Sequence, residues 1–212
     1  MKTICVMQLK GGAGRSTIST NLAGILGRTH KTLLIDCDQP QGTSDCWYAI
    51  RQEKHPDKVK NLQNASANTV NDLENLHKYA DQDYVIIDAP PRLEKQNKSA
   101  VMLADLIIIP CAPTLPDLWA THDFLELLNE AEKTAEARIA WNKYRPYTRS
   151  ARELKEDSEK DLPIEKLKSY LGYRVAYSDA VSEGLTADEV RDTNASLEII
   201  SMVNEIKKTV GK

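Results

Sequence analysis

A glycine-rich segment near the N-terminus constrains the fold more than any other feature of the chain. Gly11, Gly12 and Gly14 lie between a strand-like run, residues 3–9, and a helical pattern that begins near Ser16. Glycine permits backbone conformations closed to other residues, so successive N–H groups can converge on one point. A helix that begins there adds the positive end of its dipole. The segment therefore predicts a strand–loop–helix unit whose loop binds an anion.

The rest of the chain alternates strand and helix patterns. Apolar, β-branched runs recur at residues 32–35, 84–87, 106–110 and 138–141. Apolar residues at helical spacing separate them, at residues 18–26, 70–76 and 118–127. Such runs suit strands covered on both faces, and their alternation with helices predicts βαβ units. We therefore expect an α/β fold with a mostly parallel twisted sheet and helices on both faces.

Two polar stretches interrupt this alternation. Residues 51–68 are rich in Lys, Asn and Gln without a clear period, which predicts an exposed connection. Residues 148–168 carry a high density of both charges, which is typical of a solvated helix face.

Length and composition bound the class of protein. The 212 residues, 41% of them hydrophobic, suffice for one core, so we expect a single domain over 1–212. The net charge of −3 argues against a constitutively basic nucleic-acid protein, although it leaves room for a local basic face. No signal peptide or long apolar stretch precedes the first strand, which predicts a cytoplasmic protein. The cysteines lack metal-ligand spacing and indicate ordinary thiols, at positions Cys5, Cys37, Cys46 and Cys111.

The glycine loop has the residue types of a nucleotide phosphate site. Ser16 stands where P-loop proteins place a hydroxyl on magnesium, and the basic Arg15 precedes it. A ligand-free strand-to-helix turn is the alternative, but the register of strand, helix, serine and basic residue argues against it. Leu9 replaces the first glycine of the standard pattern, and Arg15 replaces its lysine. Because guanidinium and ammonium groups occupy phosphate sites differently, we expect binding with a changed hydrolysis rate.

At these residues the sequence resembles the ParA/MinD family of deviant Walker-A P-loop ATPases, most of all the small ParA-type partition ATPases without an N-terminal DNA-reading domain. The family loop reads Lys-Gly-Gly-x-Gly-Lys-Ser/Thr-Thr, and residues 10–17 match it except at Arg15. Three further segments agree in order, although the first has one residue more than usual before its Pro-Gln-Gly. These segments are residues 33–42, residues 84–91, and residues 104–110 followed by Pro113 and Asp117.

The resemblance implies that the chain binds ATP with Mg²⁺. The implied nucleotide contacts are Lys10, Gly11, Gly12, Ala13, Gly14, Arg15, Ser16, Thr17 and Asn142. Ser16, Asp36 and Asp88 would hold the magnesium, the two aspartates through bound waters. Lys10 would reach the partner's phosphates across a dimer, and Asp38 would orient the attacking water. An isolated strand-end aspartate is more often a cap or turn residue, but three of them after a phosphate loop favour the catalytic interpretation.

The resemblance also implies a nucleotide-switched homodimer. In the family, the ATP-bound sandwich dimer binds non-specific DNA, and a ParB-like or adaptor protein stimulates slow hydrolysis and releases it. The implied function is DNA segregation or cargo positioning by a nucleoid-associated ATPase. The candidate DNA contacts are Arg149, Arg152 and Lys155, with Lys207 and Lys208 near the C-terminus, although any of them could be a solvated surface residue.

Two other functions stay open. A MinD-like membrane-associated ATPase would use the apolar stripe over residues 197–210, which has lysines at its end but no Trp or Phe. Such a stripe packs more often on its own domain. A P-loop small-molecule kinase or ligase would need a second group of convergent catalytic residues, and the sequence shows no obvious one.

Overall fold

One seven-stranded parallel sheet organises the fold in a computed structural model that describes residues 1–79, 81–91 and 95–211. The strands are β1 (Lys2–Val6), β2 (Thr32–Asp36), β3 (Leu62–Ser66), β4 (Tyr84–Asp88), β5 (Leu106–Cys111), β6 (Ala137–Tyr144) and β7 (Glu165–Gly172). Their order across the sheet is β3-β2-β4-β1-β5-β6-β7, and every neighbouring pair is parallel. The predicted parallel α/β sheet is confirmed.

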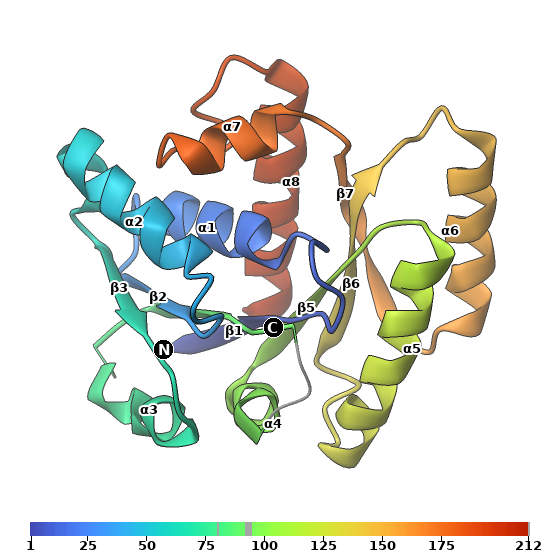
Figure 1. The fold of residues 1–212 in the computed structure, drawn as a ribbon, viewed down its shortest axis with the longest axis horizontal. Coiled ribbons are helices and arrows are strands. Elements are labelled where there is room, and N and C mark those ends of the chain that lie inside the picture. The colour runs from blue at the N-terminus through green and yellow to red at the C-terminus, as the bar shows by residue number, and fades with distance from the viewer. Residues whose placement is uncertain (80, 92–94, 212) are drawn as a thin grey trace.

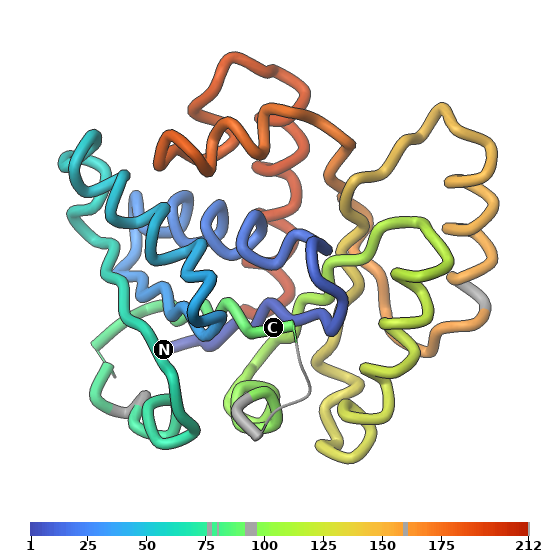
Figure 2. Tube along the Cα trace, viewed as in Figure 1, coloured from blue at the N-terminus to red at the C-terminus, as the bar shows by residue number. Residues whose placement is uncertain are grey.

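Helices cover both faces of this sheet (Figure 1). One face carries α1 (Arg15–Leu26), α2 (Thr43–Lys54), α7 (Ala176–Ser182) and α8 (Thr193–Val210). The other carries α3 (Val70–Glu74), α4 (Lys95–Leu103), α5 (Leu115–Glu130) and α6 (Arg149–Asp161). Short 3₁₀ turns follow α2 and α3, at Pro56–Val59 and Asn75–Tyr79. The trace in Figure 2 shows the same layers.

The strands are apolar on both sides because each side packs under a helix layer. In β1, Ile4 and Val6 pack with α1 and α8, while Cys5 packs toward α4 and α5. Side chains alternate along a strand, so a run without polar residues can fill two cores. The continuous apolar runs in the sequence therefore mark the central strands.

The structure corrects the sequence prediction at both edges of the sheet. Residues 51–68 are not simply an exposed connection, because they contain the end of α2 and the edge strand β3. The charged stretch 148–168 contains α6 as expected but also the start of the other edge strand, β7. Edge strands expose one side, so their sequences are polar and lack a continuous apolar run. Leu62 in β3 is buried, whereas the rest of that strand is partly or fully exposed.

Most of the apolar stripe of helix α8 packs in the core of the protein. Val203, Ile206 and Val210 are buried against the sheet, while Leu197 is 65% exposed.

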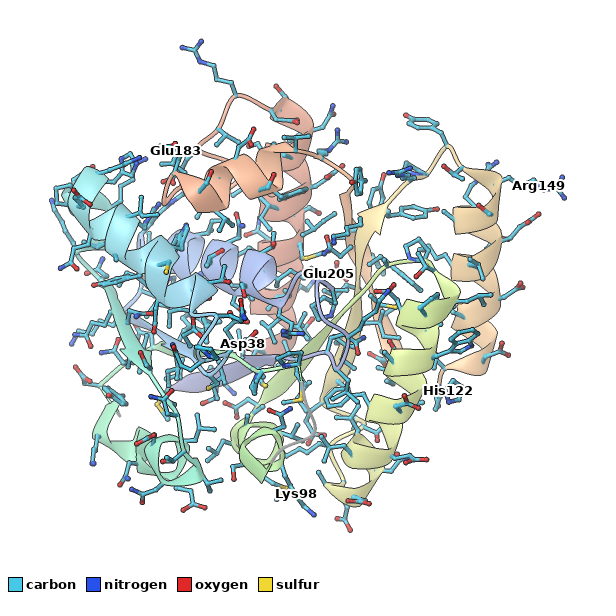
Figure 3. All side chains as sticks on the ribbon, viewed as in Figure 1. Asp38, Lys98, His122, Arg149, Glu183 and Glu205 are labelled. Atoms are coloured by element: carbon cyan, nitrogen blue, oxygen red, sulfur yellow. The ribbon has the colours of Figure 1, made fainter. Side chains whose placement is uncertain are left out.

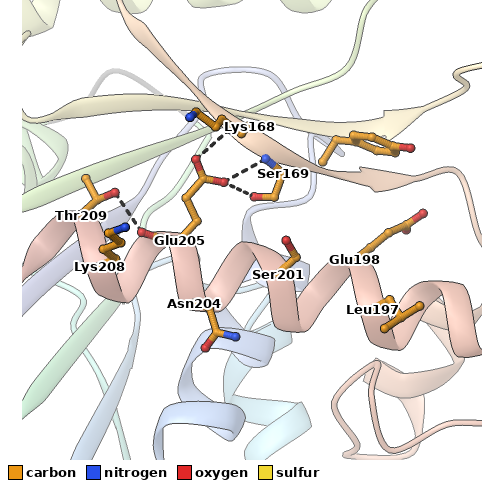
Figure 4. A pocket seen from close by; sticks show the side chains of 10 residues that line it. Lys168, Ser169, Leu197, Glu198, Ser201, Asn204, Glu205, Lys208 and Thr209 are labelled. Carbon is orange, nitrogen blue, oxygen red and sulfur yellow. Dashed lines mark hydrogen bonds between the residues drawn. The ribbon is translucent and has the colours of Figure 1, made fainter.

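On the same helix Glu205 accepts hydrogen bonds from the backbone N–H groups of Lys168 (2.8 Å) and Ser169 (2.9 Å), beside a hollow of about 750 Å³ (Figure 4). The carboxylate thus covers part of the open edge of β7. In the part of the chain that the structure describes, no helix is long and apolar enough to span a membrane.

Candidate functional site

The glycine loop connects β1 to α1 and has the backbone of an anion-binding turn. Gly12 and Gly14 have φ values of 73° and 102°. A Cβ atom at Gly14 would lie 2.0 Å from Nδ2 of Asn142, so no larger residue fits there without displacing that side chain. Helix α1 begins with no side-chain cap and no acidic residue in its first turn. Its first N–H groups are therefore suited to an external anion.

The end of β6 supports this loop from one side. Asn142 Nδ2 donates to the carbonyl oxygen of Ala13 at 2.7 Å, and Lys143 Nζ donates to that of Gly12 at 2.7 Å. The C=O and N–H of a trans peptide unit point in opposite directions. The N–H groups of Ala13 and Gly14 are therefore directed away from the side chains of Asn142 and Lys143, which donate to the loop carbonyl oxygens. Asn142 anchors the loop in this way, and its implied contact with the nucleotide stays a prediction.

Two hollows flank the loop. One hollow has a volume of about 500 Å³, and the residues that line it include Lys10, Asp117 and Arg145. The second has a volume of about 310 Å³, and the residues that line it include Thr17 and Asn142. Together they leave space on both sides of the loop.

Three residues around these hollows were missed from the sequence. Lys143 and Tyr173 line both hollows, and the Arg145 guanidinium lies 4.2 Å from the centre of the Tyr173 ring. The available signal is their place at or just after the ends of β6 and β7, and the sequence does not reveal β7, which precedes Tyr173.

Asp36 sits at the end of β2 and organises the start of α2. Its carboxylate accepts backbone hydrogen bonds from Asp38 (2.9 Å), Ser44 (2.9 Å) and Asp45 (3.0 Å). Burial raises the pKa of Asp36, and these hydrogen bonds oppose the rise. Both carboxylate oxygens thus have partners within the chain. This geometry supports a capping role, and the predicted part of Asp36 in holding magnesium stays a prediction.

Asp88 ends the neighbouring strand β4, in register with Asp36. It is fully buried and accepts hydrogen bonds from Ser44 Oγ at 2.7 Å and Ser19 Oγ at 3.3 Å. The pKa of Asp88 is raised to about 6, chiefly by burial and also by the charge of Asp36, while hydrogen bonds from Ser44 and Ser16 oppose the rise. The fold therefore brings Asp88 and Ser16, two of the predicted magnesium residues, together.

This pair fits a magnesium ion that keeps most of its water. Mg²⁺ takes oxygen ligands and is usually held by one or two protein groups plus substrate phosphates and waters. The Ser16 hydroxyl could be a direct ligand, and Asp88 could bind through a coordinated water. Within residues 1–79, 81–91 and 95–211, no three His, Cys, Asp or Glu side chains form a direct metal site.

The two basic residues of the loop have different partners. Lys10 forms an ion pair with Asp117, a buried carboxylate at the start of α5 that also accepts from the Thr114 hydroxyl. Arg15 is only 7% exposed and spans from the loop to Asp38, with Nη2 3.1 Å from Oδ2 (Asp38 is labelled in Figure 3). The loop and the residue predicted to orient water are thus joined directly.

Of the predicted DNA contacts, Arg149, Arg152 and Lys155 belong to α6, whereas Lys207 and Lys208 are exposed on α8. Arg149 points outward in Figure 3 and pairs with Glu153 at 2.6 Å, while Arg152 is exposed. Lys155 Nζ lies 5.9 Å from the centre of the Trp141 ring. The helix has four basic and five acidic residues in its sequence, which gives a net charge of −1. A DNA-binding role for this helix therefore stays a prediction and rests on individual side chains.

Comparison with known proteins decides the family. The family model described as the CobQ/CobB/MinD/ParA nucleotide binding domain matches residues 4–187. The chain belongs to this family. It is 30% identical to "Maintenance of carboxysome distribution protein A" of Halothiobacillus neapolitanus, with 96% of this chain and 95% of that protein covered. A chromosome partitioning protein ParA of Myxococcus xanthus is 29% identical over about half of each chain (51% of both).

Solved structures share the fold of this CobQ/CobB/MinD/ParA domain at lower sequence identity. The MinD cell division protein of Aquifex aeolicus superposes with a TM-score of 0.79 at 20% identity, covering 98% of both chains. A Cyanothece McdA variant in complex with ATP superposes with a TM-score of 0.77 at 17% identity, covering 100% of this chain and 96% of that one. The predicted ParA/MinD resemblance is confirmed, and the chain is a nucleotide-binding P-loop protein of this type.

Proposed function

We propose that this protein is a positioning ATPase that hydrolyses ATP to ADP and phosphate and thereby distributes a cargo within the cell. One observation carries the proposal: the glycine loop and the uncapped start of α1, which includes Ser16, lie beside Asp38 and Asp88 at the carboxyl ends of β1, β2 and β4. The names of the relatives add support, since they concern carboxysome distribution and chromosome partitioning. A Borrelia burgdorferi structure described as a "putative plasmid partition protein" bound to AMPPNP has the same fold (TM-score 0.78, 18% identity).

The site has the parts that phosphoryl transfer to water requires. The loop N–H groups and the α1 dipole would hold the phosphates, and Arg15 would offset their charge. Magnesium, when bound at Ser16, would neutralise charge on the phosphate oxygens. Asp38 would orient the attacking water, because it is partly exposed (17%) and lies beside the loop. Phosphoryl transfer needs little covalent help, so this positioning accounts for the chemistry.

A homodimer is the second part of the proposal. Lys10 keeps 37% of its side chain exposed while it pairs with Asp117. On the same helix as Asp117, Leu115 is 50% and Trp119 is 62% exposed. Exposed apolar side chains beside a binding site are typical of a surface that a partner covers. Lys10 could then leave Asp117 for the phosphates of the second subunit when ATP closes the pair.

Non-specific duplex DNA is the partner that we propose for the ATP-bound dimer. The exposed Arg149 and Arg152 would contribute phosphate contacts, and such contacts weaken with added salt. The membrane alternative has less support, because most of the apolar stripe of α8 is buried. A ParB-like or adaptor protein would stimulate hydrolysis and release the DNA.

Co-sedimentation with ATP tests this choice. We expect the protein to pellet with duplex DNA in ATP and not in ADP, and not to pellet with anionic liposomes. The double variant Arg149→Ala/Arg152→Ala should lower the slope of log affinity against log salt by about 1–2. The control Lys78→Ala/Lys98→Ala removes the same charge from exposed positions near α3 and on α4, and should behave as wild type. Pelleting with liposomes and not with DNA would contradict the DNA proposal.

A further inference from the structure

Arg15 forms a bridge that the lysine of the usual loop pattern could not form in the same way. Its Nη1 donates to the carbonyl oxygens of Gln8 at 2.8 Å and Lys10 at 3.0 Å, which anchors the side chain on the loop. Its Nη2 donates to Asp38 Oδ2 at 3.1 Å. A guanidinium has separate nitrogens for these two tasks, whereas a lysine has one nitrogen on a flexible stem.

The bond to Asp38 is the exchangeable half of this bridge. Its length of 3.1 Å exceeds the roughly 2.7–2.9 Å of a tight charge-assisted hydrogen bond. Asp38 is also 17% exposed, whereas the neighbouring Asp36 is fully buried and held by three backbone N–H groups. The Nε atom of Arg15 is buried with no hydrogen-bond partner among the described residues. The guanidinium therefore retains capacity for a further acceptor.

We propose that Arg15 is a latch between the phosphate loop and Asp38, and that the γ-phosphate of ATP opens it. In the nucleotide-free protein, Nη2 holds the Asp38 carboxylate. When a triphosphate binds, a γ-phosphate oxygen replaces the carboxylate on Nη2, and Asp38 is released to accept a hydrogen bond from the attacking water. This inference rests on the proposed function, because it takes Asp38 as the residue that orients water.

Competition between two anions for one nitrogen is the physical basis of the latch. Carboxylate and phosphate oxygens both accept charge-assisted hydrogen bonds from arginine, and they repel each other at short range. The proposed place of Asp38 is beside the γ-phosphate, so ADP, which lacks that group, leaves the carboxylate on Arg15. Arg15 is thus a positioning residue that makes Asp38 available only when a triphosphate is present.

The test is isothermal titration calorimetry on four proteins: wild type, Asp38→Asn, Arg15→Lys and the double variant. Each is titrated with magnesium plus AMPPNP and, separately, magnesium plus ADP. Asparagine keeps the shape of Asp38 and removes the competing charge. We expect Asp38→Asn to bind AMPPNP about tenfold more tightly, with the ADP affinity changed less than about twofold. In the Arg15→Lys background, the same substitution should change AMPPNP affinity less than about threefold.

Each other outcome has a distinct meaning. Equal tightening for both nucleotides, or tightening that is undiminished in the Arg15→Lys background, would indicate general relief of negative charge and overturn the latch alone. If wild type binds neither nucleotide, the proposed function fails and the latch fails with it. Thermal unfolding of each protein without nucleotide checks that it is folded. Arg15→Gln, which keeps a planar polar end without the charge, replaces Arg15→Lys if that variant does not fold.

Discussion

Replacing Asp38 with alanine should abolish steady-state ATP hydrolysis while nucleotide binding is retained. The partly exposed carboxylate lies beside the glycine loop, 3.1 Å from Arg15 Nη2, and we assign it to the attacking water. Loss of a group that positions or activates water typically costs about 10²–10⁴-fold in rate. Phosphate release measured at saturating ATP, together with the calorimetric affinity for AMPPNP, separates the two effects.

The control for this variant is Glu53→Ala. Glu53 is an exposed carboxylate on α2, the helix that follows Asp38. Glu53→Ala therefore also removes one negative charge, but at a position away from the loop. We expect its turnover to stay within about twofold of wild type. If Asp38→Ala turned over at the wild-type rate, another group would have to orient the water and the assigned mechanism would be wrong.

Glu189→Ala should produce the largest loss of stability, because it leaves a fully buried arginine without its carboxylate. Arg51 has 0% exposed side chain and contacts Glu189 through both terminal nitrogens, at 2.8 and 3.1 Å. Removing one partner of a buried pair leaves an uncompensated charge, and we expect a loss of about 2–4 kcal/mol in the free energy of unfolding. Urea denaturation followed by circular dichroism measures it.

An exposed ion pair nearby provides the matched control. Glu183 pairs with Lys54 at 2.8 Å with 57% of its side chain exposed, so Glu183→Ala should have no large effect. A similar, small loss of unfolding free energy in Glu189→Ala and Glu183→Ala would contradict the idea that the burial of Arg51 determines the destabilisation.

The same carboxylate should make the protein acid-sensitive. Burial acts to raise the pKa of Glu189, but hydrogen bonds from Arg51 and Thr186 outweigh it and lower the pKa to about 2. Because the folded-state pKa lies below the unfolded value of 4.5, this contribution is present above about pH 4.5 and is lost as the pH falls toward 2. Stability should therefore fall less steeply over this range in Glu189→Gln than in wild type.

The central part of the fold could be predicted from the sequence because its signals are local. The loop, its flanking strand and helix, and the strand-end aspartates lie within continuous segments whose apolar pattern gives their structure. The edge strands β3 and β7 could not be predicted in this way. Each has one side without a neighbouring strand, so its residues need not be apolar throughout.

The sequence offers candidate residues for the site, and their roles stay predictions, but it does not show the contacts between them. The identity of Arg15 was visible as a departure from the loop pattern, whereas its bond to Asp38 joins residues 23 positions apart. Asn142 is predicted as a nucleotide contact, and in the structure its side chain donates to the carbonyl oxygen of Ala13, 129 positions away. Such contacts depend on which strands lie side by side in the sheet, because that order decides which residues meet at the carboxyl ends of the strands. A single sequence does not specify the order.

Calorimetry of the purified protein with magnesium and AMPPNP shows whether the glycine loop binds a triphosphate. We expect a saturable heat of binding with a stoichiometry near one nucleotide per chain. We also expect Gly14→Ala to lose this binding, because a Cβ at φ 102° would stand 2.0 Å from Asn142 Nδ2. Absence of any binding heat in the wild-type protein, or undiminished binding in Gly14→Ala, would contradict the claim that residues 10–17 enclose a triphosphate.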